Sequence, residues 1–295
     1  MHPELYISST KGLEDDVTAL EMLKDSEMIA GIEGNLDIDS IEKIKSYGLR
    51  YSAQDLLMMN GSALSDDDIC KSIPEGMIER SRLSDTDFVL FQGFSRKRGL
   101  EDMAAYEIKT NLKKNSGYLK ELTGKEIAME IIPYSEYDSF HYKKAIFNMI
   151  FDPRKLKNMV KDLGIGLALD IPHIMMTGEQ YEKLNGSNDV RESILKYHDS
   201  LMEQLGDHVQ MLRISVPGIT KHDEYCDSNM PFDSSDTSRE AYFLAKETIR
   251  RCQNIEAVVL DMATEMEPKA HVSYMEEQAK YLLDYLRASG YKRAS

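Results

Sequence analysis

An aspartate and a histidine stand at the end of one apolar run, and both residue types can hold a metal ion or move a proton. The run covers Ile165 to Leu169 and ends at Asp170, and His173 follows three residues later. An uninterrupted apolar run of this length is typical of a strand buried on both faces of a parallel sheet. Reactive side chains of α/β proteins stand at the carboxyl ends of such strands. The alternative is structural, with Asp170 capping a strand end and opening a loop.

Two further apolar runs carry one acid each. Glu130 lies in the run from Lys125 to Pro133, and Asp261 ends the run that begins at Asn254. A buried carboxylate without a partner costs several kcal/mol. Three acids at similar strand ends therefore indicate a shared partner, either a cation or a polar substrate. The alternative is a separate salt bridge between each acid and the basic residues that follow its strand.

The elements that would position these acids alternate between strand and helix. Eight apolar runs predict strands over 5–9, 28–33, 49–54, 88–92, 127–132, 165–170, 209–215 and 255–261, and apolar faces predict helices over 37–47, 101–122 and 272–286. Repeated strand–helix units imply parallel strands. Eight of them fit one α/β domain, a (β/α)8 TIM barrel over residues 1–295. A doubly wound open sheet is the alternative, but no glycine-rich phosphate loop follows any run, so no nucleotide cofactor is expected.

A closed barrel would bring the candidate residues together, because all its strands end at one mouth. Glu130, Asp170, His173 and Asp261 then become neighbours. Carboxylates with an imidazole suit a divalent ion such as Mn²⁺, Mg²⁺, Zn²⁺ or Fe²⁺. Such an ion polarises a carbonyl group, and a carboxylate that does not bind the ion can act as a general base.

These strand ends resemble the xylose isomerase-like TIM barrels. The resemblance rests on a Glu at the fifth strand end (Glu130), a Leu-Asp-x-x-His motif at the sixth (Asp170, His173) and an acid at the eighth (Asp261). The layout covers nearly the whole chain. It implies a sugar or polyol isomerase or epimerase in which Glu130, Asp170 and Asp261 bind one metal ion. His173 would be a fourth ligand or an acid–base group, and Glu130, His173 and Asp261 would form the catalytic set.

The chain departs from this family at three strand ends where relatives often carry histidine. Gln54, Gln92 and Arg213 stand there instead, so one metal ion at most is expected. These three residues, with Arg96 and His222, are the expected contacts of a small polar substrate, with or without a phosphate group.

Arg213 also supports a different interpretation. If its side chain enters the mouth, it supplies positive charge to Glu130 or Asp261. The barrel would then be a metal-free, non-catalytic protein that binds a small molecule. Three other histidines, His141, His198 and His271, stand in polar, helix-like segments and are expected at the surface.

Composition limits the partners. The net charge of −15 disfavours nucleic acid as the main partner, and with it the DNA-repair activity of the endonuclease IV branch of the family. No apolar stretch approaches the roughly 18 residues of a membrane span. Three cysteines (Cys70, Cys226 and Cys252) without a Cys-x-x-Cys pair favour a reducing compartment. A cytoplasmic protein is therefore expected, and a homodimer is compatible with the sequence.

Overall fold

A ring of parallel strands forms the centre of the molecule, and each strand overlaps one of the eight predicted runs. The computed structural model describes residues 3–54, 73–93, 105–131, 133, 152–183, 189–221, 224–230, 232–262 and 266–288. The barrel strands are β1 (Glu4–Ser8), β2 (Gly31–Gly34), β3 (Arg50–Ala53), β4 (Phe88–Gln92), β5 (Glu126–Glu130), β6 (Gly166–Asp170), β7 (Val209–Ile214) and β10 (Ala257–Leu260). The predicted (β/α)8 architecture is confirmed.

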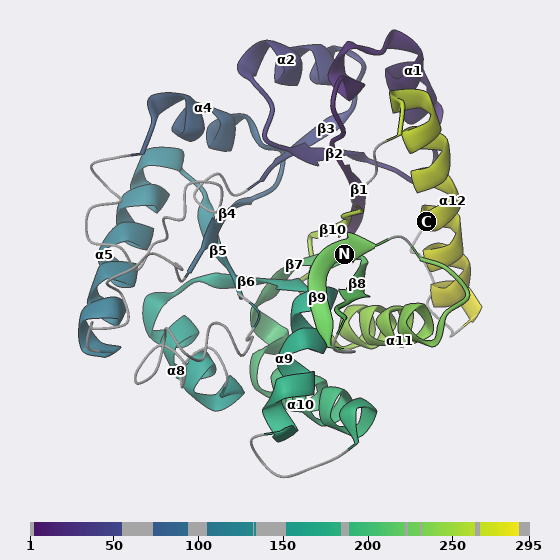
Figure 1. Ribbon diagram of the computed structural model, residues 1–295. Helices are drawn as coiled ribbons and strands as arrows, with labels where there is room; N and C mark the ends of the chain where they lie inside the picture. Colours follow the sequence, from purple (N-terminus) through teal and green to yellow (C-terminus); the bar gives the residue numbers. More distant parts are fainter. Residues whose placement is uncertain are drawn as a thin grey trace.

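The strands follow one another around the barrel in the order β3-β2-β1-β10-β7-β6-β5-β4. Every neighbouring pair in this order is parallel. Within the described part of the chain, β3 and β4 do not pair, so the barrel is nearly closed and has one seam. Figure 1 looks along the barrel and shows the helices arranged around the strands.

The helices have apolar faces that pack on the strands. They are α1 (Val17–Asp25), α2 (Ile38–Ser46), α4 (Glu75–Leu83), α5 (Ala105–Thr123), α8 (Pro153–Leu163), α9 (Ile171–Lys183), α10 (Val190–Leu205), α11 (Asp236–Arg251) and α12 (Pro268–Ala288). In α2, the side chain of Asp37 accepts a hydrogen bond from the backbone nitrogen of Ser40, and Ile41 and Ile44 are buried. This is the cap and face pattern of an amphipathic helix. The three helices predicted from sequence are confirmed as α2, α5 and α12. Among the described helices, none is long and apolar enough to cross a bilayer.

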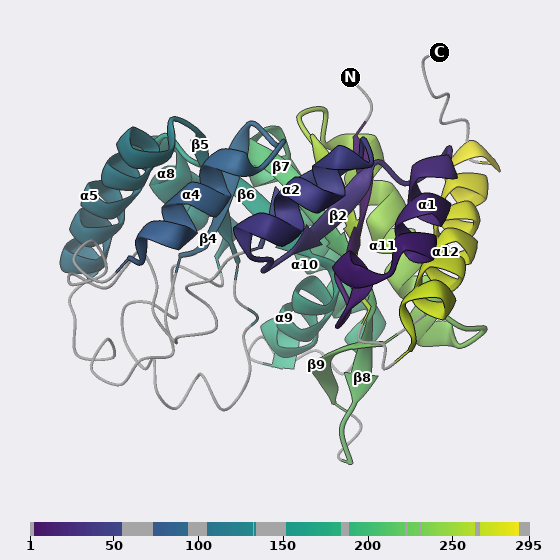
Figure 2. The same cartoon turned by 90° about the horizontal axis from the view of Figure 1, so that it is seen from above.

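A helix directly after β6 and a hairpin after β7 were not predicted from the sequence. Helix α9 begins directly after Asp170, and the Asp170 side chain accepts a hydrogen bond from the backbone nitrogen of His173 at 3.3 Å. The alternative of a loop at this point is therefore wrong, since Asp170 opens a helix. After β7 the chain forms an antiparallel hairpin of β8 (Val216–Ile219) and β9 (Tyr225–Met230). Figure 2 shows α9 and this hairpin on the same side of the barrel.

Side chains fill the inside of the barrel. Tyr6, Phe88, Leu90, Ala128, Ala168, Met211, Ala257 and Val259 form one buried cluster there. A larger apolar cluster lies between the strands and the helices. A barrel packed in this way is no pore, so only its two ends can hold polar chemistry.

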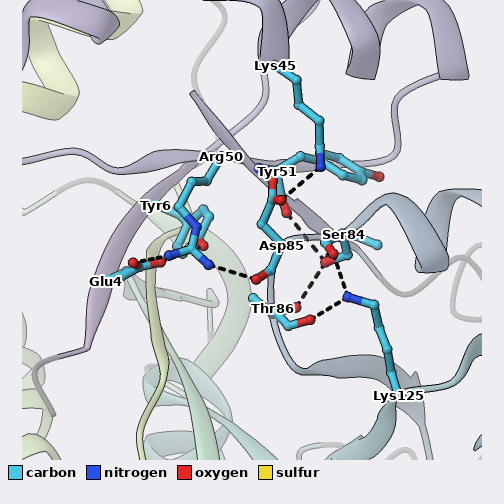
Figure 3. Close-up of polar contacts among 10 residues, drawn as sticks. Glu4, Tyr6, Lys45, Arg50, Tyr51, Ser84, Asp85, Thr86 and Lys125 are labelled. Atoms are coloured by element: carbon cyan, nitrogen blue, oxygen red, sulfur yellow. Dashed lines mark hydrogen bonds and ion pairs between the residues drawn. The ribbon is translucent and has the colours of Figure 1, made fainter. Parts of the chain in front are cut away.

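Polar contacts close the seam at the amino-terminal end of the strands (Figure 3). The Asp85 carboxylate accepts hydrogen bonds from the Tyr51 backbone nitrogen and from Lys45 Nζ, both at 2.8 Å. The Asp85 backbone nitrogen in turn donates to the Tyr51 carbonyl at 2.7 Å. Arg50 joins Glu4 to the Asp85 carbonyl. The segment around Asp85 thus satisfies the edge of β3 in place of a neighbouring strand.

Substitution of Asp85 tests this seam. We expect Asp85→Ala to lower the free energy of unfolding by about 1 to 3 kcal/mol, because the Tyr51 N–H loses its acceptor. Asp85→Asn keeps one acceptor oxygen and should cost less. Urea denaturation measures both, with Asp39→Ala on the exposed side of α2 as the control. Wild-type stability in both Asp85 variants would show that the seam does not depend on this side chain.

Candidate functional site

Three of the predicted residues meet at the carboxyl ends of β5 and β6. Glu130 is the last residue of β5, Asp170 is the last residue of β6, and His173 lies in the first turn of α9. One ligand atom from each lies within 4.8 Å of the others, and all three side chains are buried. The two strands are neighbours, and the immediate start of α9 places His173 beside them. The set has the composition of a divalent-metal site.

The imidazole of His173 is held in a defined orientation. Its Nδ1 lies 3.0 Å from the carbonyl oxygen of Ile131 and 3.8 Å from Glu130 Oε1. A carbonyl oxygen can only accept, so Nδ1 carries the proton in this hydrogen bond. In the neutral ring the lone pair is then on Nε2. A backbone carbonyl on one ring nitrogen is the usual support of a metal-binding histidine.

Arg213 lies in the mouth, beside the same acids. It is the penultimate residue of β7, and its side chain is 4% exposed. Its Nη2 donates a hydrogen bond to Glu33. Its Nη1 lies 3.7 Å from Glu130 Oε1 and 3.8 Å from Asp261 Oδ2. Glu130 and Asp261, far apart in the chain, therefore both lie within 4 Å of one guanidinium nitrogen.

Glu33 is a member of the site that the sequence reasoning missed. It lies on β2, and its side chain is completely buried. In the strand order β2 and β7 are separated by β1 and β10, so the pair with Arg213 reaches across the barrel. The sequence did carry a signal for Glu33, because Glu33 ends an apolar run as Asp261 does.

The buried site carries more negative than positive charge. Burial alone would lower the pKa of Arg213, but Glu33, Glu130, Asp261 and Asp170 raise it well above its ordinary value, so the guanidinium stays charged. Burial raises the pKa of Glu33 to about 7 despite Arg213, and Asp261 and Glu130 add to the rise. Within the described residues, Glu33 Oε2 and Glu130 Oε2 are buried without a hydrogen-bond partner. Even with Glu33 protonated, one arginine does not balance the remaining three carboxylates, and a divalent cation at Glu130, Asp170 and His173 fits this imbalance.

The raised pKa of Glu33 makes stability depend on pH. The folded protein holds a proton on Glu33 up to a pH of about 7, whereas the unfolded chain releases it near 4.5. The contribution of Glu33 to stability is therefore greatest below 4.5 and is lost as the pH rises towards about 7. We expect Glu33→Gln to remove this loss. The difference between the urea-unfolding free energies of wild type and variant should change between pH 5 and pH 7, and a constant difference would contradict the assignment.

A cavity of about 570 Å³ lies beside these charges. It is lined by Ser8, Ser9, Thr10, Lys11, Glu33, Gln54, Asn229, Asp261, Met262, Met266, Glu267 and Pro268. Asn229 comes from β9 and has a φ of 45°, a conformation that asparagine tolerates. Its Nδ2 donates to Asp261 Oδ2 at 3.4 Å, and its Oδ1 accepts from Ser215 at 3.1 Å. The hairpin therefore brings a polar side chain to the cavity and to Asp261.

The remaining residues predicted to contact the substrate or the metal ion lie in different places. Gln54 lines the cavity. Gln92 ends β4, but its side chain is outside the described residues, as are Arg96 and His222. Asp261 is not part of the compact group of Glu130, Asp170 and His173. It lies against Arg213 and the cavity instead, and its side chain is 14% exposed.

His198 and His271 are buried, so the expectation that these two lie at the surface is wrong, and His141 lies outside the described residues. Each stands on the inner face of a helix, α10 or α12. His198 Nε2 lies 2.9 Å from the Thr248 hydroxyl, and burial lowers the pKa of His198 to about 4. His271 Nε2 lies 3.0 Å from the Ser8 carbonyl oxygen, and burial lowers its pKa as well. Both histidines connect a helix to its neighbours.

The fold defines the chain as a TIM barrel, and solved structures of xylose isomerase-like proteins have a similar fold. A D-tagatose 3-epimerase-like protein matches with 12% identity and a TM-score of 0.63, covering 97% of this chain and 99% of that one. A xylose isomerase domain protein from Salmonella typhimurium matches with 9% identity and a TM-score of 0.62, over 97% and 99%. A xylose isomerase-like TIM barrel protein from Mycobacterium smegmatis, in complex with magnesium, matches with 10% identity and a TM-score of 0.53, over 98% and 97%.

At this level of identity the likeness concerns the fold. No family model matches the sequence. No curated protein matches it either.

Proposed function

We propose that the protein is an isomerase or epimerase of a small sugar or polyol that depends on a single divalent metal ion. The observation that carries the proposal is the buried group of Glu130, Asp170 and His173 at the barrel mouth. The sugar epimerase names among the structural neighbours support the choice of reaction. The polar lining of the adjacent cavity suits a substrate rich in hydroxyl groups.

Each side chain then has a role. Glu130, Asp170 and His173 would hold the ion, which could be Mn²⁺, Zn²⁺, Mg²⁺ or Fe²⁺. When bound, the ion would polarise the substrate carbonyl and so acidify the neighbouring C–H. Asp261 is one of three carboxylates that line the cavity, and its position beside Arg213 would allow it to take that proton and return it.

The neighbours of Asp261 support this role. Arg213 and Asn229 both contact its Oδ2, so we assign proton transfer to Oδ1. Gln54 and Asn229 line the cavity and would orient substrate hydroxyls. The described cysteines, Cys226 and Cys252, are free thiols, which supports placing the reaction in the reducing cytoplasm.

Two measurements test the proposal together. Purified protein supplied with Mn²⁺, Zn²⁺ and Fe²⁺ should retain about one ion per chain by mass spectrometry, because a preformed site binds its metal readily. The loaded protein, incubated in D₂O with D-fructose, D-tagatose or D-psicose, should place deuterium on a carbon beside the carbonyl. Less than ~0.1 ion per chain, or no incorporation with any of a broad panel of sugars, would contradict it.

A specific observation favours a second function, a metal-free barrel that binds a small molecule. Arg213 already lies among three of the acids. In that case sugars should raise the melting temperature equally with and without EDTA, because ligand binding to the folded state stabilises it by mass action. No deuterium would be incorporated. A rise that requires metal decides for the enzyme.

A further inference from the structure

We propose that Glu179 is a positioning residue for the substrate side of the barrel mouth, which fixes the β8–β9 hairpin to α9 and so holds Asn229 at the cavity and at Asp261. This inference rests on the proposed function, in which Asn229 orients substrate hydroxyls. Among the described residues, Glu179 belongs neither to the compact group that would hold the metal nor to the cavity lining. It is a buried acid that the proposed chemistry does not use.

The carboxylate of Glu179 has a specific partner on the hairpin. Glu179 is 4% exposed. Its Oε2 accepts a hydrogen bond from the backbone nitrogen of Tyr225 at 3.0 Å. Tyr225 is the first residue of β9. Burying a carboxylate is costly unless it is hydrogen-bonded, so this contact compensates the burial of Glu179 and anchors the start of β9 to α9.

Helix α9 is a firm support for this anchor. It begins directly after Asp170, and its first turn carries His173. At Gly178 it lies so close to α10 that a Cβ atom there would be 2.7 Å from Ile194 Cα. Elements packed this closely do not shift independently of one another. Glu179, the next residue, therefore ties the hairpin to the same helix that places His173.

The hairpin depends on contacts outside itself. A two-stranded hairpin is at best marginally stable alone, and the pairing of β8 with β9 is irregular between Val216 and Gly218. Both strands contact α9, and Figure 2 shows them beside this helix. Asn229 lies near the far end of β9 from Tyr225, and its φ of 45° departs from extended geometry. The position of Asn229 is therefore not set by strand pairing alone.

Asn229 connects the hairpin to the group assigned to proton transfer. Its Nδ2 donates to Asp261 Oδ2 at 3.4 Å, which is long for a hydrogen bond, so a small displacement of β9 would break the contact. A displacement of about 1 Å at a reacting group can lower a rate about 100-fold. Loss of the Glu179 anchor should therefore reach the reaction through Asn229.

The side-chain amide of Asn229 reports on the anchor without a substrate. In protein carrying isotope-labelled asparagine, its nuclear magnetic resonance signal is identified by its loss in Asn229→Gly, since glycine tolerates this φ. Glu179→Met removes the acceptor and should shift or broaden the signal, whereas Glu179→Gln keeps an acceptor oxygen and should retain it. Thr248→Val, which removes a buried contact to His198 instead, is the control and should leave the signal unchanged. An unchanged signal in Glu179→Met would overturn the inference.

A second pair of variants covers the case in which Glu179→Met does not fold. Tyr225→Pro removes the donor and leaves α9 intact, at a strand position where proline is tolerated. Tyr225→Ala removes the same side chain but keeps the backbone N–H. The Asn229 signal should change further in Tyr225→Pro than in Tyr225→Ala, and the same signal in both would overturn the inference.

Deuterium exchange tests whether the anchor acts through Asn229. With whichever of D-fructose, D-tagatose and D-psicose exchanges fastest, Glu179→Met should lower the rate by about 100-fold. Its Mn²⁺ affinity should stay at the wild-type value, because the metal group is separate. Glu179→Met/Asn229→Gly should be no slower than Asn229→Gly, and losses that multiply in the double variant would overturn the inference alone. A wild type that exchanges no deuterium would overturn the proposed function, and the Asn229 signal would still decide whether Glu179 holds this residue.

Discussion

Replacing Arg213 alone with methionine should lower the free energy of unfolding by about 3 to 5 kcal/mol in metal-free buffer. The substitution leaves Glu33 and Glu130 buried, and Asp261 nearly so, without the cation that contacts all three. Removing one partner of a buried ion pair is costly because the other charge remains without water and without compensation. Urea denaturation in EDTA measures the effect at a pH above about 7, where Glu33 is ionised in the folded wild type.

The double variant Glu33→Gln/Arg213→Met is the matched control. It removes the ion pair as a unit, so it should be more stable than Arg213→Met although it carries one more substitution. The recovery would be a coupling energy between the two side chains. The loss in the free energy of unfolding of the double variant could equal the sum of the losses of Glu33→Gln and Arg213→Met. That result would mean that Glu33 and Arg213 do not stabilise the fold through their mutual contact.

The second large effect concerns metal affinity. Glu130→Gln and Asp170→Asn should each weaken divalent-ion binding by about 100-fold or more, since even residues that only support a ligand contribute about 10- to 100-fold. Both changes preserve side-chain shape and remove a charged ligand oxygen from the compact group. Titration calorimetry with Mn²⁺ measures the affinities.

Asp261→Asn provides the comparison for these two variants. Asp261 lies in the same mouth but outside the compact group, so this change should weaken metal binding much less. Under the proposed function it should instead abolish proton transfer. An Asp261→Asn variant that loses metal as completely as Glu130→Gln would make Asp261 a ligand and contradict the division of roles.

The sequence predicted the elements whose signal is local. An apolar run marks a strand buried on both faces, and each of the eight runs overlaps a barrel strand. The acids at the ends of β5 and β6 could be brought together because the strands of a barrel end at one mouth. The same rule applied to the run before Glu33 would have found the fourth carboxylate.

Other features depend on contacts that one sequence does not reveal. The pair of Arg213 and Glu33 crosses the barrel, so only the closed strand order brings its members together. The hairpin after β7 was not predicted, because Tyr225–Met230 is largely polar and lacks the alternation of a half-buried strand. His198 and His271 appeared exposed because polar residues flank them, although the face of the helix decides their burial.

Crystals soaked in Mn²⁺ and measured for anomalous scattering test the central claim most directly. We predict one strong anomalous peak, bounded by Glu130, Asp170 and His173 at bond lengths of about 2.0 to 2.6 Å. The Arg213 guanidinium should remain between Glu33, Glu130 and Asp261. A mouth without an anomalous peak at saturating Mn²⁺ would contradict the metal site and favour the metal-free interpretation, in which Arg213 is the cation beside these acids.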